Sequence, residues 1–430
     1  MSAVKEKLAL FGGPKAVPQP IPHYNSLGPE EVVAAQRVVS SGQLSLFFGS
    51  WGDNFLGGPE VRAFEREWSE HFKVRHSVSV NSATSGLIAA VGACGVGPGD
   101  EVIVSPFTMC ASASCVRVFG GTPVFADICE DTYNLDVKSI ERCITPKTKA
   151  IIVVDLAGQP ADFNEIMALA RSKGIKVIED SAQAPGALFE GRFAGTLADI
   201  GIFSLNCHKT IQTGEGGVCC TNDDDLAARL QLIRNHGEAV VEEMGLKHAP
   251  ESILGFNFRL GEIEAAIGRE QLRKLDRLTQ PRQEIARIFD ERLGKLPGLK
   301  VPVVRPGRTH VYYTYMMRVI ESEAGISRRQ LIKALEAEGA PGYEGYCRPL
   351  YLAKLYQADW PTKNGRYYGP GISPVTERLY ERELFYHMYL YESMREPWVE
   401  QICQAYEKIW ANREQLAEVA DDGARAVRRA

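Results

Sequence analysis

The sequence predicts an α/β fold in which a mostly parallel seven-stranded sheet carries helices on both faces, followed by a smaller α+β C-terminal domain. Between residues 77 and 222, short β-branched runs alternate with helix-sized segments. Such alternation is typical of parallel βαβ units, which place helices on both faces of a sheet. After about Leu296 the alternation stops, and a strand-like run is followed by amphipathic helical patterns.

Seven strands are expected in the first part of the chain. The run AIIVVDL (150–156) is almost wholly apolar, as expected of a strand that is buried on both faces. Residues 201–221 leave no room for a helical crossover, and so they predict an antiparallel pairing around a turn. The expected strands are 76–80, 101–105, 122–127, 150–156, 176–180, 200–205 and 216–221.

Helical periodicity marks the other elements. The spacing of apolar residues predicts helices around 32–39 and 61–72, at 81–94 and 162–173, and at 262–275 and 278–293. In the C-terminal part it predicts a strand over 311–320 and helices over 328–338 and 398–419. Residues 342–373 are rich in Tyr, Pro and Gly and are expected to form loops near the site.

These elements predict three parts: an extended N-terminal arm (1–27), a large domain (28–295) and a small C-terminal domain (296–430). The first 25 residues are rich in Pro and Gly and are expected to run over the surface. They contain no long apolar run, which argues against a signal peptide or a membrane anchor and for a cytoplasmic protein.

Charge and cysteine content exclude several functions. The net charge is −5 and no basic block is visible, so neither nucleic acid nor an acidic membrane surface is an expected partner. The ten cysteines are scattered and form no CxxC pair. We therefore expect free thiols in a reducing compartment and no metal site.

The stretch FSLNCHKTIQTGEGG (203–217) places Lys209 in a largely apolar run just before a glycine-rich turn. Burial makes an ammonium costly, and a lysine kept partly neutral can attack an aldehyde. The glycines allow a tight turn and close chain approach. A lysine whose ammonium reaches solvent from a strand end explains the same pattern equally well.

The stretch KVIEDSAQAPGA (176–187) ends a predicted strand with Asp180. In an open α/β sheet, ligands bind beyond the carboxyl ends of the strands. A carboxylate at that place can keep the ring nitrogen of pyridoxal phosphate (PLP) protonated, and Gln183 can bond the phenolic oxygen of the ring. Asp180 or Ser181 could also cap the helix that follows, and both roles can hold at once.

The stretch VNSATSG (80–86) opens a helix with small and hydroxylated residues directly after a strand. A helix N-terminus offers free N–H groups and a positive dipole end, which together bind phosphate. Ser82, Ala83 and Thr84 are the candidates for this contact. Any Ser/Thr helix start looks similar, so the motif alone is weak.

Together these motifs resemble the DegT/StrS family of PLP-dependent sugar and cyclitol aminotransferases. The matching stretches run from LALFGG (8–13) through DEVIV (100–104), EDSAQ (179–183) and HKTIQTGEGG (208–217) to GFNFRLGEIEAAIG (255–268). The resemblance covers most of the chain. It implies the type I fold of PLP-dependent transferases, which is that of aspartate aminotransferase.

The resemblance also implies residue roles. Lys209 would form the Schiff base with PLP, Asp180 would bind the pyridine nitrogen and Gln183 the ring oxygen. Ser204 would bind the phosphate together with Ala83 and Thr84. Asn257 matches an asparagine that family members extend to the neighbouring subunit's cofactor, which implies a homodimer with shared sites; alternatively Asn257 is an ordinary turn residue.

Three positions depart from the family pattern. Met109 stands where an aromatic residue usually covers the PLP ring, and a methionine can pack on a ring through its sulfur. Asn206 replaces a frequent histidine and Ala83 a frequent glycine. Neither of these two changes removes essential chemistry.

The implied activity is a two-step amino transfer in amino-sugar or antibiotic biosynthesis. L-Glutamate or L-glutamine would be the donor, and a keto-sugar, nucleotide-linked or not, or a keto-cyclitol would be the acceptor. One rival is a keto-deoxy-sugar dehydratase, in which histidine replaces the lysine; the presence of Lys209 argues against it. The other rival is a non-catalytic regulatory protein, which would lack Lys209 or Asp180 or add a DNA-binding segment.

The acceptor pocket is predicted from two aromatic segments. YEGYCRPLY (343–351) and LFYHMYLY (384–391) are expected to line it. Arg348 in the first segment could bind a carboxylate or phosphate, or could make a surface salt bridge. Because function resides in loops carried by a common fold, the sequence leaves the acceptor open.

Overall fold

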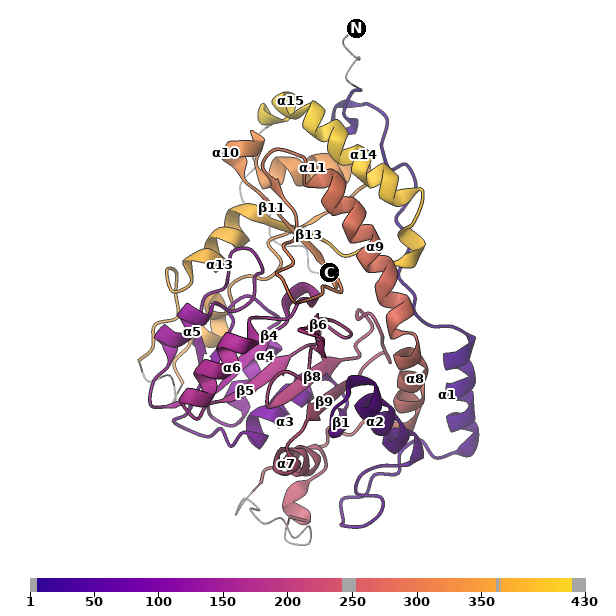
Figure 1. Cartoon of the computed structure of the whole chain (residues 1–430), viewed down its shortest axis with the longest axis vertical. Helices are drawn as coiled ribbons and strands as arrows, with labels where there is room; N and C mark the ends of the chain where they lie inside the picture. The colour runs from indigo at the N-terminus through magenta and orange to yellow at the C-terminus, as the bar shows by residue number, and fades with distance from the viewer. Residues whose placement is uncertain (1–5, 242–252, 361–362, 364, 420–430) are drawn as a thin grey trace.

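The computed structural model describes residues 6–241, 253–360, 363 and 365–419 (Figure 1). Residues 1–5 of the predicted arm, 361, 362 and 364 of the predicted loop segment, and 420–430 of the predicted small domain lie outside the described residues. None of the described helices is both long and apolar enough to cross a membrane.

The seven predicted strands form one sheet in the order β1-β9-β8-β5-β4-β2-β3. Neighbouring strands run parallel except for β9, which is antiparallel to both β1 and β8. The predicted antiparallel pairing after residue 201 and the predicted fold class are therefore confirmed. The strands are β1 (His76–Val80), β2 (Glu101–Val104), β3 (Thr122–Phe125), β4 (Thr148–Val154), β5 (Lys176–Asp180), β8 (Ile200–Ser204) and β9 (Gly217–Thr221). A separate hairpin pairs β6 (Leu188–Phe189) with β7 (Arg192–Phe193).

Both faces of the sheet are covered, because successive side chains of a strand point to opposite faces. On one face, Ile152 and Ile178 pack with α3 (Ala83–Ala93), α4 (Ala111–Val118) and α7 (Asp224–Arg234). On the other face, Ile151 and Val177 pack with α5 (Val137–Cys143) and α6 (Phe163–Ser172). That second face is extended over β8 and β9 by α2 (Pro59–Phe72) and α8 (Glu262–Arg273).

The C-terminal part has its own antiparallel sheet in the order β10-β11-β13-β12, and a core of its own. Its strands are β10 (Leu299–Lys300), β11 (Tyr315–Val319), β12 (Tyr343–Glu344) and β13 (Leu384–His387). Its helices include α10 (Glu321–Ala324), α11 (Arg328–Glu338), α12 (Lys354–Gln357), α13 (Pro374–Arg378), α14 (Trp398–Ala411) and α15 (Arg413–Ala417). The helix α9 (Leu275–Leu293) joins the two parts (Figure 1).

Residues 342–373, expected to form loops, include β12 and α12, and two predicted elements are shorter in the structure. The strand expected over 311–320 begins only at Tyr315, because Tyr312 has a left-handed backbone with φ 50°. The helix expected over 398–419 is interrupted at Asn412. The larger sheet with its helices is called the large domain, and the C-terminal sheet with its helices the small domain. The boundaries at residues 27 and 295 stay predictions.

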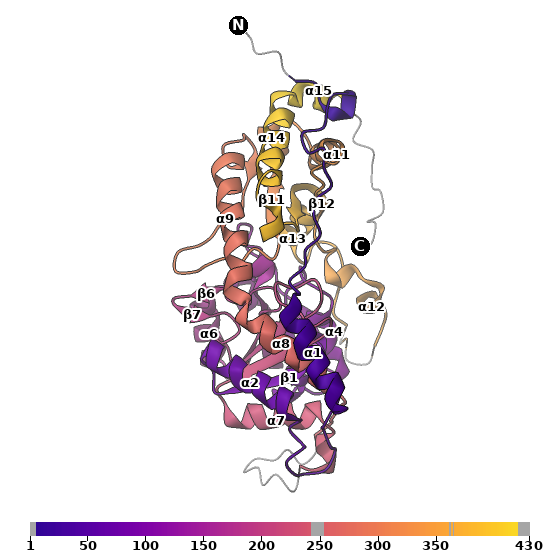
Figure 2. The ribbon, with the colours of Figure 1, turned by 90° about the vertical axis from the view of Figure 1, so that its right-hand side faces the viewer.

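The N-terminal arm is anchored more firmly than predicted. It descends along the small domain to α1 (Pro29–Ser41) (Figure 2). Leu8 and Val17 are buried in the core of the small domain. Farther along, the Tyr24 hydroxyl donates a hydrogen bond to the carbonyl of Thr210, which follows Lys209. The arm therefore contacts both domains.

The helix α1 leaves much of its apolar surface uncovered. Its buried residues Ala34 and Val38 pack against α8, whereas Val32, Val33 and Val39 are exposed. Phe48 and Trp51 in the following loop are also exposed. We call the exposed residues Leu27, Val32, Val33, Val39, Leu44, Phe48 and Trp51 the apolar surface.

Candidate active site

The predicted site residues gather at one edge of the seven-stranded sheet. The strands β1, β5 and β8 all end at this edge, and the antiparallel β9 begins there. Gly217, the first residue of β9, pairs with Val80 on one side and with Ser204 on the other. The three central motifs of the sequence are thereby brought together.

The start of α3 lies at this edge. Ser82 is the N-cap, and its hydroxyl accepts a hydrogen bond from the Ser85 amide at 3.0 Å. The amides of Ala83 and Thr84 belong to the first turn, which has no intrahelical acceptors, and no acceptor is found for them among the described residues. A Cβ atom on Gly217 would lie 2.7 Å from the Ala83 nitrogen. Only glycine therefore keeps the space beside these amides open.

Asp180 ends β5 and is 5% exposed. Its carboxylate accepts hydrogen bonds from the Ser112 hydroxyl at 2.8 Å and from the Ala182 amide at 3.2 Å. Burial raises the pKa of this carboxyl, whereas Ser112, Ala182 and the charge of Lys209 each lower it in part. Asp180 therefore lies buried at the end of β5 with two of its carboxylate contacts supplied by the chain itself.

Lys209 lies in the loop between β8 and β9, and its side chain is half-buried. The loop is closed by hydrogen bonds from the amides of Leu205 and Cys207 to the carbonyls of Gly216 and Gly214, both at 2.9 Å. Gly214 has φ 82°, a left-handed conformation that favours glycine. The glycine-rich turn thus holds Lys209 at the strand edge, as the sequence predicts.

Gln183 follows Asp180 and is buried. Its side-chain oxygen accepts a hydrogen bond from the Ala157 amide at 2.7 Å, and its nitrogen donates to the Tyr346 hydroxyl at 2.6 Å. Burial raises the pKa of the Tyr346 phenol well above its usual range, so this hydroxyl stays neutral. Gln183 therefore joins the strand edge to the loop after β12.

Three other predicted residues, Met109, Asn257 and Arg348, are exposed. Met109, in the loop after β2, is 62% exposed. Asn257 is exposed, and its carbonyl lies 3.5 Å from the side-chain nitrogen of Asn81, just before α3. Arg348 is exposed and makes no ion pair within the described part of the chain.

The aromatic segments are divided between the site and the core. Tyr343 stacks on Tyr386 with ring centroids 5.4 Å apart, and Tyr346 packs edge-on against Tyr386. Tyr389 and Tyr391 are instead buried in the small-domain core, which corrects the expectation that the whole segment 384–391 lines the pocket. Alternation along β13 turns only part of that segment toward the large domain.

Residues 50–407 match the DegT/DnrJ/EryC1/StrS aminotransferase family. The chain belongs to this family. Its members are PLP-dependent, and this chain is an aminotransferase of that kind.

Two relatives of this aminotransferase have names that refer to sugar metabolism. The spore coat polysaccharide biosynthesis protein SpsC of Bacillus subtilis is 33% identical over 89% of this chain and 95% of its own. The GDP-perosamine synthase of Caulobacter vibrioides is 40% identical over 70% of this chain and 79% of its own. An aminotransferase from Psychrobacter cryohalolentis has a solved structure with TM-score 0.79 and 32% identity, covering 91% of this chain and 99% of its own.

Two residues at the site of this aminotransferase were not predicted from its sequence. Ser112 donates to Asp180 from the first turn of α4. Tyr313 lies with its ring 4.3 Å from the Lys209 ammonium. A hydroxyl in the first turn after β2 is a weak signal for the former. Tyr313 was missed because it was assigned to a strand over 311–320, whereas in the structure it lies in the loop before that strand.

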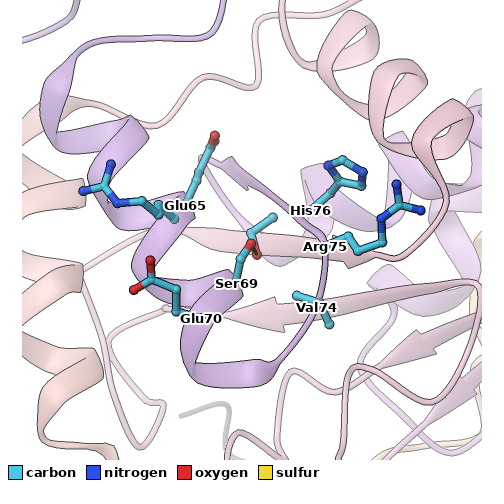
Figure 3. Close-up of a pocket in the computed structure, with 8 residues that line it drawn as sticks. Glu65, Ser69, Glu70, Val74, Arg75 and His76 are labelled. Atoms are coloured by element: carbon cyan, nitrogen blue, oxygen red, sulfur yellow. Dashed lines mark hydrogen bonds between the residues drawn. The ribbon is translucent and has the colours of Figure 1, made fainter.

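A hollow of about 360 Å³ lies elsewhere on the large domain, between α2 and the start of β1 (Figure 3). Several of its lining groups already have partners. The Ser69 and Ser77 hydroxyls are 2.8 Å apart, and Arg75 and His76 both contact Asp224. The hollow is at the opposite end of β1 from Ser82, and we assign it no ligand.

Proposed function

We propose that this aminotransferase moves the amino group of L-glutamate or L-glutamine to the keto group of a nucleotide-linked sugar, with PLP bound at the sheet edge. The observation that carries the proposal is the meeting of Lys209, Asp180 and the α3 N-terminus at one edge of the sheet.

The residues at this edge fit PLP. The free amides of Ala83 and Thr84, beside the space that Gly217 keeps open, suit a phosphate, with the hydroxyls of Ser82 and Ser204 nearby. Asp180 suits the pyridine nitrogen and Lys209 the aldehyde. Gln183 would bind the ring oxygen through its second amide hydrogen, and Met109 would pack on the ring. When bound, the cofactor supplies an electron sink for the carbanion formed at the donor's α-carbon.

The chain's own groups then supply the proton chemistry. Asp180, ionised, keeps the ring nitrogen protonated from a buried position where charges interact strongly. Lys209, once released from the cofactor, takes a proton from the donor's α-carbon and returns one to the acceptor carbon, as a general base and then a general acid. Both groups lie at the strand edge, where the substrate's reacting carbon must lie as well.

Support for the acceptor comes from two sources. Tyr343, Tyr346 and Tyr386 form a cluster of polar-tipped rings that reaches the site through the hydrogen bond between Gln183 and Tyr346, and rings of this type suit a base or sugar face. Arg348, exposed and without an ion-pair partner among the described residues, suits a diphosphate. The name of the Caulobacter relative also contains a nucleotide-linked sugar.

The test uses the amino form of the loaded enzyme. L-Glutamate and L-glutamine are first compared as donors by the loss of the aldehyde absorbance. Nucleotide-linked keto-sugars, free keto-sugars and inososes are then added separately, and return of the absorbance is measured. We expect nucleotide-linked keto-sugars to restore it fastest. Restoration by inososes alone would replace the acceptor with a cyclitol, and restoration by none would contradict the acceptor class.

We also propose that two copies form a dimer whose sites are completed across the interface by Asn257. Asn257 pairs with Asn235, whose side chain donates hydrogen bonds to the carbonyls of Phe48 and Phe55 at 2.8 and 3.0 Å. Phe48, which is exposed and belongs to the apolar surface, is therefore tied through Asn235 to Asn257. Exposed apolar patches of this kind favour burial against a partner, and a two-fold axis would bring Asn257 toward the partner's site.

Mixing two variants that are impaired at limiting PLP tests this arrangement. Asn257→Ala should weaken PLP binding about ten- to a hundredfold, since a hydrogen bond to a charged group contributes about 1.5–3 kcal/mol. The exposed Asn164→Ala serves as the control. In a mixed dimer of Lys209→Ala and Asn257→Ala subunits, one site carries both defects and the other carries neither. Activity at limiting PLP should therefore reappear on mixing. If demonstrably mixed dimers show no recovery, Asn257 serves its own chain, beside Asn81.

A further inference from the structure

The Lys209 ammonium rests on an aromatic ring. Its Nζ atom lies 4.3 Å from the centroid of the Tyr313 ring. Within the part of the chain that the structure describes, Nζ makes no hydrogen bond and no ion pair. A cation this close to a ring face is attracted by the negative potential of the ring. Tyr313 is therefore the direct contact of the free lysine.

The backbone around Tyr313 is held in an unusual shape. The preceding residue, Tyr312, has φ 50°, which is costly for a bulky side chain and persists only where the surroundings impose it. Its amide donates to the Nδ1 atom of His310 at 2.8 Å, and its carbonyl accepts from Arg282 at 3.2 Å. The amide of Thr314 donates to the Ala157 carbonyl. These contacts turn the Tyr313 ring toward Lys209.

Buried Arg282 connects the loop that carries Tyr313 with the loop that carries Lys209. Arg282, on α9, binds the Tyr312 carbonyl, and its guanidinium lies 4.9 Å from the centroid of the Tyr24 ring. The Tyr24 hydroxyl in turn donates to the carbonyl of Thr210, next to Lys209. Arg282 thus holds the Tyr313 loop directly and the Lys209 loop through Tyr24. The relative position of the two loops is therefore set by the fold.

We propose that Tyr313 is a positioning residue that receives the Lys209 ammonium whenever the lysine is not bound to the cofactor. A ring attracts the cation but accepts none of its three N–H bonds. A carboxylate in the same place would hold the lysine in an ion pair and would compete with Asp180. The inference rests on the proposed role of Lys209.

The first test needs no cofactor. Lys209 in the apo-protein is labelled with acetic anhydride, and its labelling rate relative to exposed Lys149 is measured by peptide mass spectrometry. Because the ring attracts the ammonium and holds it in place, Tyr313→Leu should free the side chain and raise this relative rate by about 3- to 30-fold. Tyr313→Phe keeps the ring and should stay near the wild-type rate. Tyr367→Leu removes an exposed tyrosine whose hydroxyl bonds the Pro370 carbonyl, and should also leave the rate unchanged.

A second series separates attraction from simple shielding. Mono-, di- and trifluorinated phenylalanines at position 313 weaken the negative face of the ring with little change in its size. The labelling rate of Lys209 should rise stepwise along this series. A flat series, or a Tyr313→Phe rate equal to that of Tyr313→Leu, would overturn the proposal. If Tyr313→Leu fails to fold, Tyr313→Met provides a second variant without a ring.

In the loaded enzyme, Tyr313→Leu should slow single-turnover amino transfer from L-glutamate, and Tyr313→Phe should restore it. A general structural defect would not be corrected by the ring alone. Borohydride reduction followed by peptide mapping tests the proposed function independently. An adduct on another lysine would contradict the role of Lys209, whereas the labelling series would still report whether Tyr313 holds its ammonium.

Discussion

Lys209→Ala should abolish covalent cofactor binding and almost all transamination. The substitution removes both the amine that binds the aldehyde and the group that moves the proton, and the loss of proton transfer alone costs about 10²–10⁴-fold. Wild-type protein treated with borohydride should carry the reduced cofactor on Lys209, whereas the variant should carry none. Activity with L-glutamate and mass spectrometry of the peptides provide the two measurements.

The control is Lys149→Ala. Lys149 lies near the start of β4, at the opposite edge of the sheet from the site, and its side chain is exposed. This variant should retain wild-type turnover and the adduct. A reduced adduct on any lysine other than Lys209 would show that the proposed attachment site is wrong.

Asp180→Asn should keep the cofactor bound but lose transamination about 10²-fold or more. A neutral amide cannot keep the ring nitrogen protonated, so the carbanion at the donor's α-carbon loses its stabilisation. Absorbance reports cofactor binding, and single turnover with L-glutamate reports the chemistry. Turnover close to wild type would mean that another residue binds the ring nitrogen.

The companion variant Ser112→Ala should shift the pH at which the Asp180 carboxyl gains its proton. Burial raises the pKa of Asp180, so its carboxyl gains a proton at a higher pH than an exposed aspartate would as the pH falls. The Ser112 hydroxyl opposes this by donating to the carboxylate. Its removal should raise the acid midpoint of kcat/KM by about 1–2 pH units, because a hydrogen bond to a charged group contributes about 1.5–3 kcal/mol. An unchanged midpoint would contradict this coupling.

The sheet could be predicted from the sequence because its signals are local. Five-residue runs such as His76–Val80 and Lys176–Asp180 form strands with the predicted bounds, and β-branched residues favour an extended backbone wherever they are buried. The strand expected over 311–320 was too long because a contact with a distant residue overrides its local pattern. Its tyrosines suit a strand, but Arg282, distant in sequence, fixes Tyr312 in a left-handed turn. No local pattern contains that contact.

At the site, too, local sequence predicted some residues and missed those whose contacts depend on packing. Lys209, Asp180 and Ser82 follow directly from strand ends, and the parallel topology places such ends at one edge. Ser112 and Tyr313 act through side chains on other elements, and their contacts depend on how the elements pack. The partner of Gln183 could not be predicted either, because Tyr346 arrives from the small domain, 163 residues along the chain.

The N-terminal arm also bears on how the enzyme matures during synthesis. Residues 8–24 leave the ribosome early, but Leu8 and Val17 are buried among residues of α11 and α14, which are made about 300 residues later or more. The Lys408 ammonium donates to the Pro14 carbonyl, and the Tyr391 hydroxyl to that of Pro22. Until those partners exist, the arm has no surface to occupy, and Tyr24 cannot fix the loop that carries Lys209. A nascent chain in which α14 has not yet been made would thus hold an assembled sheet with an unsecured Lys209 loop.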